Sequence, residues 1–139
     1  MREILFRGKT IENKSKWVEG FYNHIPCGKF MCDEHDIQTI DEDGRIGQLY
    51  AVYESSVGQS TGLTDKNGKK IFEGDIIKHY NDARHPDRFE IGMVWWDDCH
   101  MCFKRTSKPA SVYVWCNCIY EVIGNIHDNP ELLEVNDGS

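Results

Sequence analysis

The stretch TGLTDKNGKKIFEGDIIK, residues 61–78, decides the fold that we predict for this chain. Its Asn67-Gly68 pair supplies the positive φ values that a two-residue hairpin turn requires, so two strands should flank it. Glu73-Gly74-Asp75 comes after the second of these strands. The glycine there predicts a sharp bend, and a neighbouring carboxylate should accept hydrogen bonds from the amides around it. The stretch therefore predicts three consecutive strands joined by two tight turns.

Apolar residues that alternate with polar ones predict more strands on both sides of this stretch. In the N-terminal half these strands lie around Ile4 and Phe6 and at residues 17–22, 36–40 and 48–54. In the C-terminal half they lie at residues 76–80, 89–96, 101–105 and 112–124. Residues 55–60, SSVGQS, have the composition of a connector between the two halves.

A second motif, YEVIGNIHDNPELLE at residues 120–134, ends in a helix-start signature, because Asn129 can cap a turn whose first position is Pro130. Together with the opening MREILFRGK and residues 61–78, this motif resembles the YopX family of phage and prophage proteins. The resemblance implies an SH3-like barrel in the C-terminal half and the cytoplasm of a bacterial host cell. It implies no biochemical role, because none is established for that family.

Five short strands after residue 60, closed by a helical turn, also predict a small barrel. We therefore predict a mainly β protein with a β-rich N-terminal region at residues 1–60 and an SH3-like barrel domain at residues 61–135. A short C-terminal helical turn should close the barrel domain. Residues 136–139 should form a frayed tail.

Composition excludes several classes of protein. The chain has 139 residues, is 40% hydrophobic and carries a formal net charge of −7. It shows neither a secretory signal nor a run of 18 apolar residues, which favours a soluble cytoplasmic protein. No positive stripe suited to duplex DNA is visible. In a reducing cytoplasm the six cysteines should be thiols or metal ligands and not disulfides.

Four of these cysteines form a candidate metal site, namely Cys99, Cys102, Cys116 and Cys118. A CxxC pair and a CxC pair can bring four thiolates to one Zn²⁺. However, Cys116 and Cys118 on one strand would be about 7 Å apart, farther than adjacent zinc ligands normally lie. The alternative, which we favour, is that these thiols pack as small apolar side chains, and we predict no metal or other cofactor.

Aromatic and basic residues form a candidate binding surface in the C-terminal half. Trp95 and Trp96 are adjacent on a strand, so one should face the core and the other should face outward. The outward ring can stack on a nucleic-acid base or a peptide proline. The residues that would surround it are Tyr80, Lys78, Lys104 and Arg105.

We predict no catalytic site. Cys99 and His100 are neighbours on a strand and point to opposite faces, so they cannot form a dyad. His24 with Cys27, and Cys32 with His35, lack an oxyanion hole or a nucleophile elbow. Glu73 and Asp75 are better explained as turn residues.

Two functions remain from different classes. The first is a non-enzymatic accessory protein of a phage or prophage that acts through protein–protein contact and associates with itself. The second is a single-stranded nucleic-acid-binding module that uses the small barrel. The first fits the acidic balance and the apolar strand edges that need to be covered.

The bend at Gly74 generates a testable prediction about stability. A β-carbon should be disfavoured at this bend, so Gly74→Val should lower the free energy of unfolding by about 1–3 kcal/mol. Replacing Lys69 or Lys70, which should face solvent, should change that free energy very little. Thermal unfolding measures both. A Gly74→Val protein that melts like the wild type would contradict a structural role for the bend.

Overall fold

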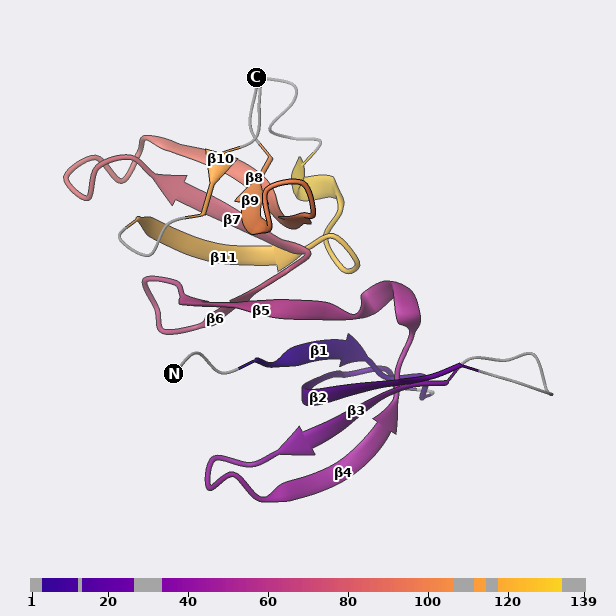
Figure 1. The fold of residues 1–139 in the computed structure, drawn as a ribbon. Helices are drawn as coiled ribbons and strands as arrows, with labels where there is room; N and C mark the ends of the chain where they lie inside the picture. Colours follow the sequence, from indigo (N-terminus) through magenta and orange to yellow (C-terminus); the bar gives the residue numbers. More distant parts are fainter. Residues whose placement is uncertain (1–3, 13, 27–33, 107–111, 115–117, 134–139) are drawn as a thin grey trace. The chain divides into compact units, whose positions relative to one another are not determined.

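The computed structural model describes residues 4–12, 14–26, 34–106, 112–114 and 118–133. As predicted, the chain is mainly β, and its strands form two antiparallel sheets (Figure 1). It divides into two compact units, Met1–Ser60 and Thr61–Ser139. None of the helical segments in the described residues is long and apolar enough to cross a membrane.

The first unit is built on a sheet in the order β4-β3-β2-β1-β5. Its elements are β1 (Phe6–Lys9), β2 (Trp17–Ile25), β3 (Glu34–Ile40), β4 (Ile46–Ala51), the 3-10 turn η1 (Glu54–Ser56) and the start of β5 (Gly58–Thr64). Val18, Ile37 and Val52 form its buried core. β2 and β3 approach closely at Gly20, where a β-carbon would lie 1.9 Å from the backbone oxygen of Gln38.

Val52, just after β4, joins the beginning and the end of the first unit. Its amide donates to the backbone oxygen of His35 at 2.9 Å, and it forms an isolated β-bridge with Thr10. Val52 and Thr10 are 1% and 0% exposed. A β-carbon on Gly8 would lie 2.9 Å from the Cβ of Val52, so a larger residue at position 8 would displace this contact.

The connector predicted at residues 55–60 is wrong in part, because β5 already begins at Gly58 and Ser56 belongs to η1. The serine is buried: its hydroxyl accepts from the amide of Lys9 at 2.8 Å and donates to the carbonyl of Tyr53 at 2.6 Å. From the sequence, this hydroxyl is expected to lie in a solvent-exposed linker. In the structure it satisfies backbone groups inside the unit.

The second unit holds a sheet in the order β10-β9-β8-β7-β11, and β5 also pairs with β6. Its further elements are β6 (Lys70–Phe72), β7 (Asp75–Tyr80), β8 (Phe89–Asp97), β9 (Cys102–Arg105), β10 (Val112–Tyr113), β11 (Ile119–Asn125) and a helical turn at residues 131–133. Ile71, Ile77, Val94, Phe103 and Tyr120 form its core. Since the described outer strands β10 and β11 are not neighbours in this sheet, the finer prediction of an SH3-like barrel is not confirmed.

The turn at Asn67-Gly68 is not the two-residue turn that we predicted. Among the described residues other than glycine, Met101 alone has a positive φ, so Asn67 lacks the angle such a turn requires. Gly68 does have a φ of 82°. The turn spans five residues, because the amide of Asp65 donates to the backbone oxygen of Lys69 at 2.7 Å.

The hairpin between β3 and β4 repeats this turn with the same chemistry. In both DEDGR (residues 41–45) and DKNGK (residues 65–69), the first aspartate accepts from the amides two and four residues later. The glycine at the fourth position has a φ of 80° in one turn and 82° in the other. An aspartate side chain and a left-handed glycine therefore define both hairpins.

Asp65 does more than close its own turn. It is 7% exposed, and its second carboxylate oxygen accepts from the amide of Val122 at 2.9 Å. The amide of Lys66 donates to the carbonyl of Tyr120 at 2.9 Å, so the turn covers the outer strand β11. Burial raises the pKa of Asp65, but the amides of Val122, Lys69 and Asn67 outweigh this effect and lower it.

The bend at Gly74 is confirmed, with a φ of 91°. Asp75 is 1% exposed and accepts from the amide of Phe72 at 2.7 Å, as the neighbouring carboxylate was expected to do. At the C-terminal turn the backbone oxygen of Asn129 accepts from the amide of Leu132 at 3.1 Å, as expected for the residue that precedes a helical turn, but its side-chain oxygen accepts from the amide of Asn125 at 3.3 Å. That contact leaves little room at Gly124, where a β-carbon would lie 2.6 Å from the same oxygen.

The two matched turns allow the effect of burial to be measured. Asp65→Ala should lower the free energy of unfolding by about 2–3 kcal/mol, because three backbone amides lose a charged acceptor in a buried place. Asp41→Ala removes the same local hydrogen bonds at an exposed turn and should cost about 1 kcal/mol or less. Chemical denaturation of both variants tests this. Equal losses would show that the contact with β11 contributes nothing.

Candidate functional site

The basic residues of the predicted binding surface lie on neighbouring strands, but acidic residues accompany them. Lys104 on β9 contacts Asp97, with 2.7 Å between Nζ and Oδ2. Arg105 is 2% exposed and contacts Glu90, with 2.7 Å between Nη2 and Oε2. This pairing reduces the positive potential that would attract a phosphate backbone.

The two tryptophans differ in their surroundings. Trp96 packs against the core and meets Phe103 edge-to-face at 4.9 Å, and its indole N–H donates to Asp98 at 2.8 Å. Trp95 is half-buried and lies opposite Lys104, whose Nζ is 6.0 Å from the ring centroid. Trp96 is therefore the inward ring of the pair.

Tyr80 and Lys78 on β7 also have partners. The Tyr80 hydroxyl donates to Glu121 at 2.9 Å, and the Nζ of Lys78 lies 4.4 Å from the ring centroid of Phe89. The structure thus brings the predicted residues onto adjacent strands β7, β8 and β9, each with a described partner within the unit. Binding of single-stranded nucleic acid at this surface stays a prediction.

The candidate zinc site is described only in part, because Cys116 lies outside the described residues. Cys99 is exposed, Cys102 is half-buried, and Cys118 packs against the core of the second unit. The described residues contain no group of three or more His, Cys, Asp and Glu side chains that could hold a metal ion.

On these strands the buried Arg105 joins the half-buried His79 and the exposed Glu90. The guanidinium of Arg105 donates through Nε to Nδ1 of His79 at 3.0 Å and through Nη2 to Glu90 at 2.7 Å. Burial lowers the pKa of His79 and Arg105 lowers it further, while Glu90 acts in the opposite direction. A neutral imidazole is therefore the form whose Nδ1 accepts the hydrogen bond from the Arg105 Nε–H.

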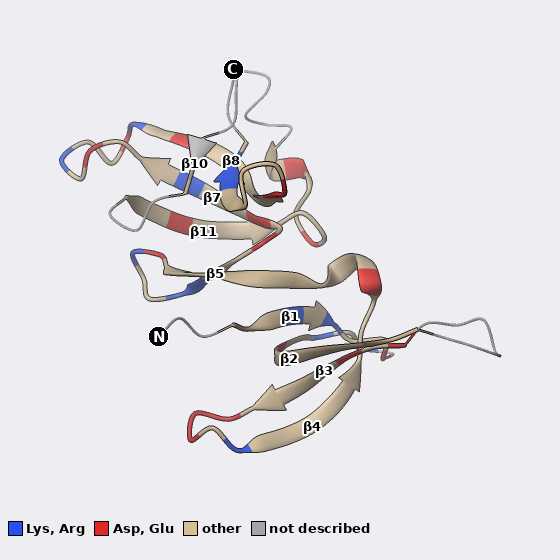
Figure 2. Cartoon of the chain, in the orientation of Figure 1, with Lys and Arg blue, Asp and Glu red and all other residues tan. Residues whose placement is uncertain are grey.

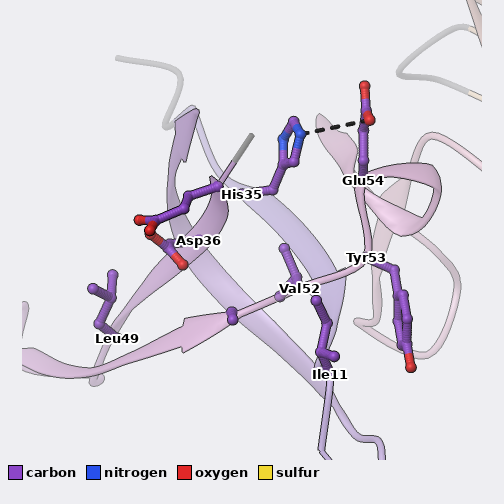
Figure 3. A pocket seen from close by; sticks show the side chains of 9 residues that line it. Ile11, His35, Asp36, Leu49, Val52, Tyr53 and Glu54 are labelled. Atoms are coloured by element: carbon purple, nitrogen blue, oxygen red, sulfur yellow. Dashed lines mark ion pairs between the residues drawn. The ribbon is translucent and has the colours of Figure 1, made fainter. Parts of the chain in front are cut away.

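A pocket of about 520 Å³ lies in the first unit, at the end of β4 (Figure 3). Nine residues line it: Ile11, Glu34, His35, Asp36, Leu49, Ala51, Val52, Tyr53 and Glu54. They come from β3, from the end of β4, from the segment that follows β4, and from Ile11 just after β1. The register explains part of this grouping, because Asp36 lies directly opposite Ala51.

His35 is the polar group deepest in this pocket, at 9% exposure. Its Nδ1 lies 2.5 Å from the hydroxyl of Tyr22, and its ring stacks on that of His24 at 4.3 Å. Its Nε2 makes no hydrogen bond within the described structure, and the carboxylate of Glu54 lies 3.5 Å away (Figure 3). His35 is therefore fixed on one side by Tyr22, and on the other side its buried Nε2 faces the carboxylate of Glu54.

The acidic residues that line the pocket are not balanced by basic ones. Glu34, Asp36 and Glu54 supply three carboxylates, while its nine lining residues include no lysine or arginine. Ile11, Leu49 and Tyr53 add apolar walls that are 53%, 50% and 47% exposed. This combination suits an organic cation with an apolar stem, such as an arginine or lysine side chain.

Sequence reasoning missed this pocket. It considered His35 only together with Cys32, which lies outside the described residues. The run Glu34-His35-Asp36 was a local signal, since alternation places Glu34 and Asp36 on one face. Glu54 and Ile11 reach the pocket only through the hydrogen bonds around Val52, and no local sequence pattern indicates those bonds.

Comparison with known proteins gives three findings. The family model described as YopX protein matches residues 6–134. No curated protein matches the chain. The crystal structure of protein EF1440 from Enterococcus faecalis is similar, with 23% sequence identity and a TM-score of 0.47 over 96% of this chain and 99% of that chain.

The His79 trio predicts a titration that NMR can follow. The pKa of His79 should lie below the ordinary value of about 6.5. Because the unfolded state then takes up a proton first, the free energy of unfolding should fall as the pH drops below about 6.5. Glu90→Gln removes a charge that favours the imidazolium and should lower the pKa further. A pKa that rises in this variant would contradict the assignment.

Proposed function

We propose that this chain, which belongs to the YopX family, is a non-enzymatic protein–protein interaction module that associates with further copies of itself. The observation that carries the proposal is the outer strand β4 of the first unit. Among the described strands β4 has a neighbour, β3, on one side only. Its other side is bonded at the end, where the carbonyl of Ala51 accepts from the amide of Ile11 at 3.0 Å, and the part of the strand before Ala51 offers backbone groups to which a second strand can add.

β4 lacks the features that usually protect such an edge. Its sequence, IGQLYA, contains neither a charged residue nor a proline, and five of its six residues are exposed. Figure 2 shows the strand without charge along its length, next to an acidic hairpin turn. Natural edge strands commonly carry a lysine or a proline that prevents pairing with another chain. The absence of both in β4 supports a strand whose edge becomes covered.

Apolar side chains extend this surface onto the exposed face of the sheet. Phe21 on β2 lies opposite Gln38 on β3, which lies opposite Leu49 on β4, so these three form one cross-strand row. Phe21 and Leu49 are each 50% exposed, and Ile46 at the start of β4 is 72% exposed. Phe21 and Leu49 lie on either side of the polar Gln38, and surfaces that mix apolar and polar side chains in this way are common in protein–protein interfaces.

In the second unit a hairpin turn covers the outer strand β11, and this distinguishes β11 from β4. The Asp65 turn covers β11 through the amides of Lys66 and Val122. β4 has the corresponding hairpin turn, residues 41–45, but that turn lies at its own beginning, and the hydrogen bonds described for Asp41 stay within the turn. This difference favours β4 as the surface for association.

We further propose the setting that family membership suggests: an accessory protein of a phage or prophage, acting in the cytoplasm of the bacterial host. An SH3-like arrangement of the second unit belongs to the same proposal. Its support is the succession of short antiparallel strands from β5 to β11 around one core. A host or phage protein that binds the same edge is compatible with this role.

The proposal predicts that a charge on β4 prevents association. The wild-type protein should form oligomers whose population grows with concentration, and Leu49→Lys should shift it to the monomer because a lysine at the edge opposes pairing. Met101→Lys is the matched control, since Met101 is also an exposed apolar residue, at 72%, but lies in a turn. Sedimentation velocity at several concentrations measures both. A wild type that stays monomeric throughout would overturn self-association.

A further inference from the structure

We infer that Cys99 and Cys102 form a dithiol site that exchanges reversibly with small-molecule disulfides. The turn between β8 and β9 then exists in a dithiol form and in a disulfide form. Both cysteines are thiols in the structure. In a reducing compartment a disulfide that forms and breaks is the expected kind, because a permanent one is rare there. The site lies in the second unit, and its chemistry does not depend on the association proposed for β4.

The turn between β8 and β9 brings the two cysteines close together. Residues 98–101 form this turn, and Asp97 at the end of β8 lies directly opposite Cys102 at the start of β9. Residues that are three positions apart across a tight turn have Cα atoms within about 7 Å of each other. A disulfide requires Cα atoms about 4.4–6.8 Å apart. Cys99 and Cys102 can therefore be bridged with little movement of the backbone.

The carboxylate of Asp97 fixes the turn in this shape. It is 7% exposed, and one of its oxygens accepts from the amide of Cys99 at 2.9 Å. The other oxygen contacts Nδ1 of His100 and Nζ of Lys104, each at 2.7 Å. Asp97 and Cys102 project from the same face of the hairpin, because directly opposed residues of antiparallel strands share a face. The backbone of Cys99 is thus held at the face from which the Cys102 thiol projects.

Met101 has the backbone conformation that closes this turn. Its φ is 52°, the only positive φ among the described residues other than glycine. A left-handed conformation costs free energy in a residue with a β-carbon, so it persists only where the surrounding contacts enforce it. The turn therefore holds its two cysteines in place before any disulfide forms. This arrangement gives each thiol a high effective concentration at the other.

The two thiols differ in their access to solvent, and this difference assigns their order of reaction. Cys99 is exposed, whereas Cys102 is half-buried. A dissolved disulfide therefore reaches Cys99 first, and Cys102 completes the reaction within the turn. Cys118, the third cysteine that the structure describes, packs against the core of the second unit and is also half-buried. The exposed thiol among these three is thus the one with a second cysteine across its turn.

The exchange proceeds in two steps that conserve electrons and protons. The deprotonated Sγ of Cys99 attacks one sulfur of a disulfide R–S–S–R, forms a mixed disulfide and releases the other half, which takes up a proton and becomes a thiol. The deprotonated Sγ of Cys102 then attacks the Sγ of Cys99, forms the bond between the two cysteines and releases the second half as a thiol. The two cysteines lose two electrons and two protons, and the small-molecule disulfide gains them. An excess of a small-molecule thiol reverses both steps.

Mixtures of oxidised and reduced glutathione test the site in the full chain. When oxidised glutathione predominates, the wild type should form a disulfide, which mass spectrometry of alkylated peptides should locate between Cys99 and Cys102. Cys102→Ser should stop at a mixed disulfide between Cys99 and glutathione, because the second thiol is absent. Cys99→Ser should react at position 102 about tenfold more slowly or less, because that thiol is half-buried. An excess of reduced glutathione should return the wild type to two thiols.

Cys118→Ala is the matched control, because it removes a thiol of the same unit that lies outside the turn. It should form the same disulfide as the wild type, and circular dichroism checks that each variant keeps its fold. A wild type whose thiols stay reduced when oxidised glutathione predominates would overturn the inference. A disulfide located between any other pair of cysteines would overturn it as well. If Cys102→Ser accumulates no mixed disulfide at Cys99, the order of reaction assigned to the two thiols is wrong.

Discussion

Burying a carboxylate is unfavourable unless hydrogen-bond donors replace the water that it loses, and the second unit is organised around one aspartate that meets this condition. Asp65 closes its own hairpin with two amides and holds β11 with a third. The same side chain therefore sets the turn geometry and the position of a strand 57 residues away in the chain. The contact that joins these two distant segments of the chain is therefore a polar one, not an apolar one.

The local part of this arrangement could be predicted from sequence, because turn chemistry depends on adjacent residues. The bend at Gly74 with its Asp75 acceptor, the strand content and the family were all predicted correctly. The form of the Asn67-Gly68 turn was not, since the same dipeptide fits a two-residue turn and the third and fourth positions of a five-residue turn. The aspartate at position 65 decides between them, through hydrogen bonds that a dipeptide signal ignores.

The pocket could not be predicted for a different reason: its residues come together only through tertiary contacts. Glu34 and Asp36 share a face of β3, but Glu54 and Ile11 reach the pocket through the bridge between Val52 and Thr10. The predicted basic surface shows a second effect of tertiary contacts that the sequence does not reveal. Lys104 and Arg105 are indeed neighbours on β9, yet their charge is compensated by Asp97 and Glu90 from β8. A list of charged residues does not indicate how cross-strand partners neutralise them.

The bridge between Val52 and Thr10 has a consequence for the order in which the chain acquires its structure. Hairpins such as β3–β4 involve only local contacts and can form as soon as their residues are synthesised. The bridge between Thr10 and Val52, in contrast, can form only after Val52 has emerged from the ribosome. During that interval the apolar β2–β4 face is exposed in the nascent chain, where encounters with other chains compete with folding. On a polysome, neighbouring nascent copies would meet in this state.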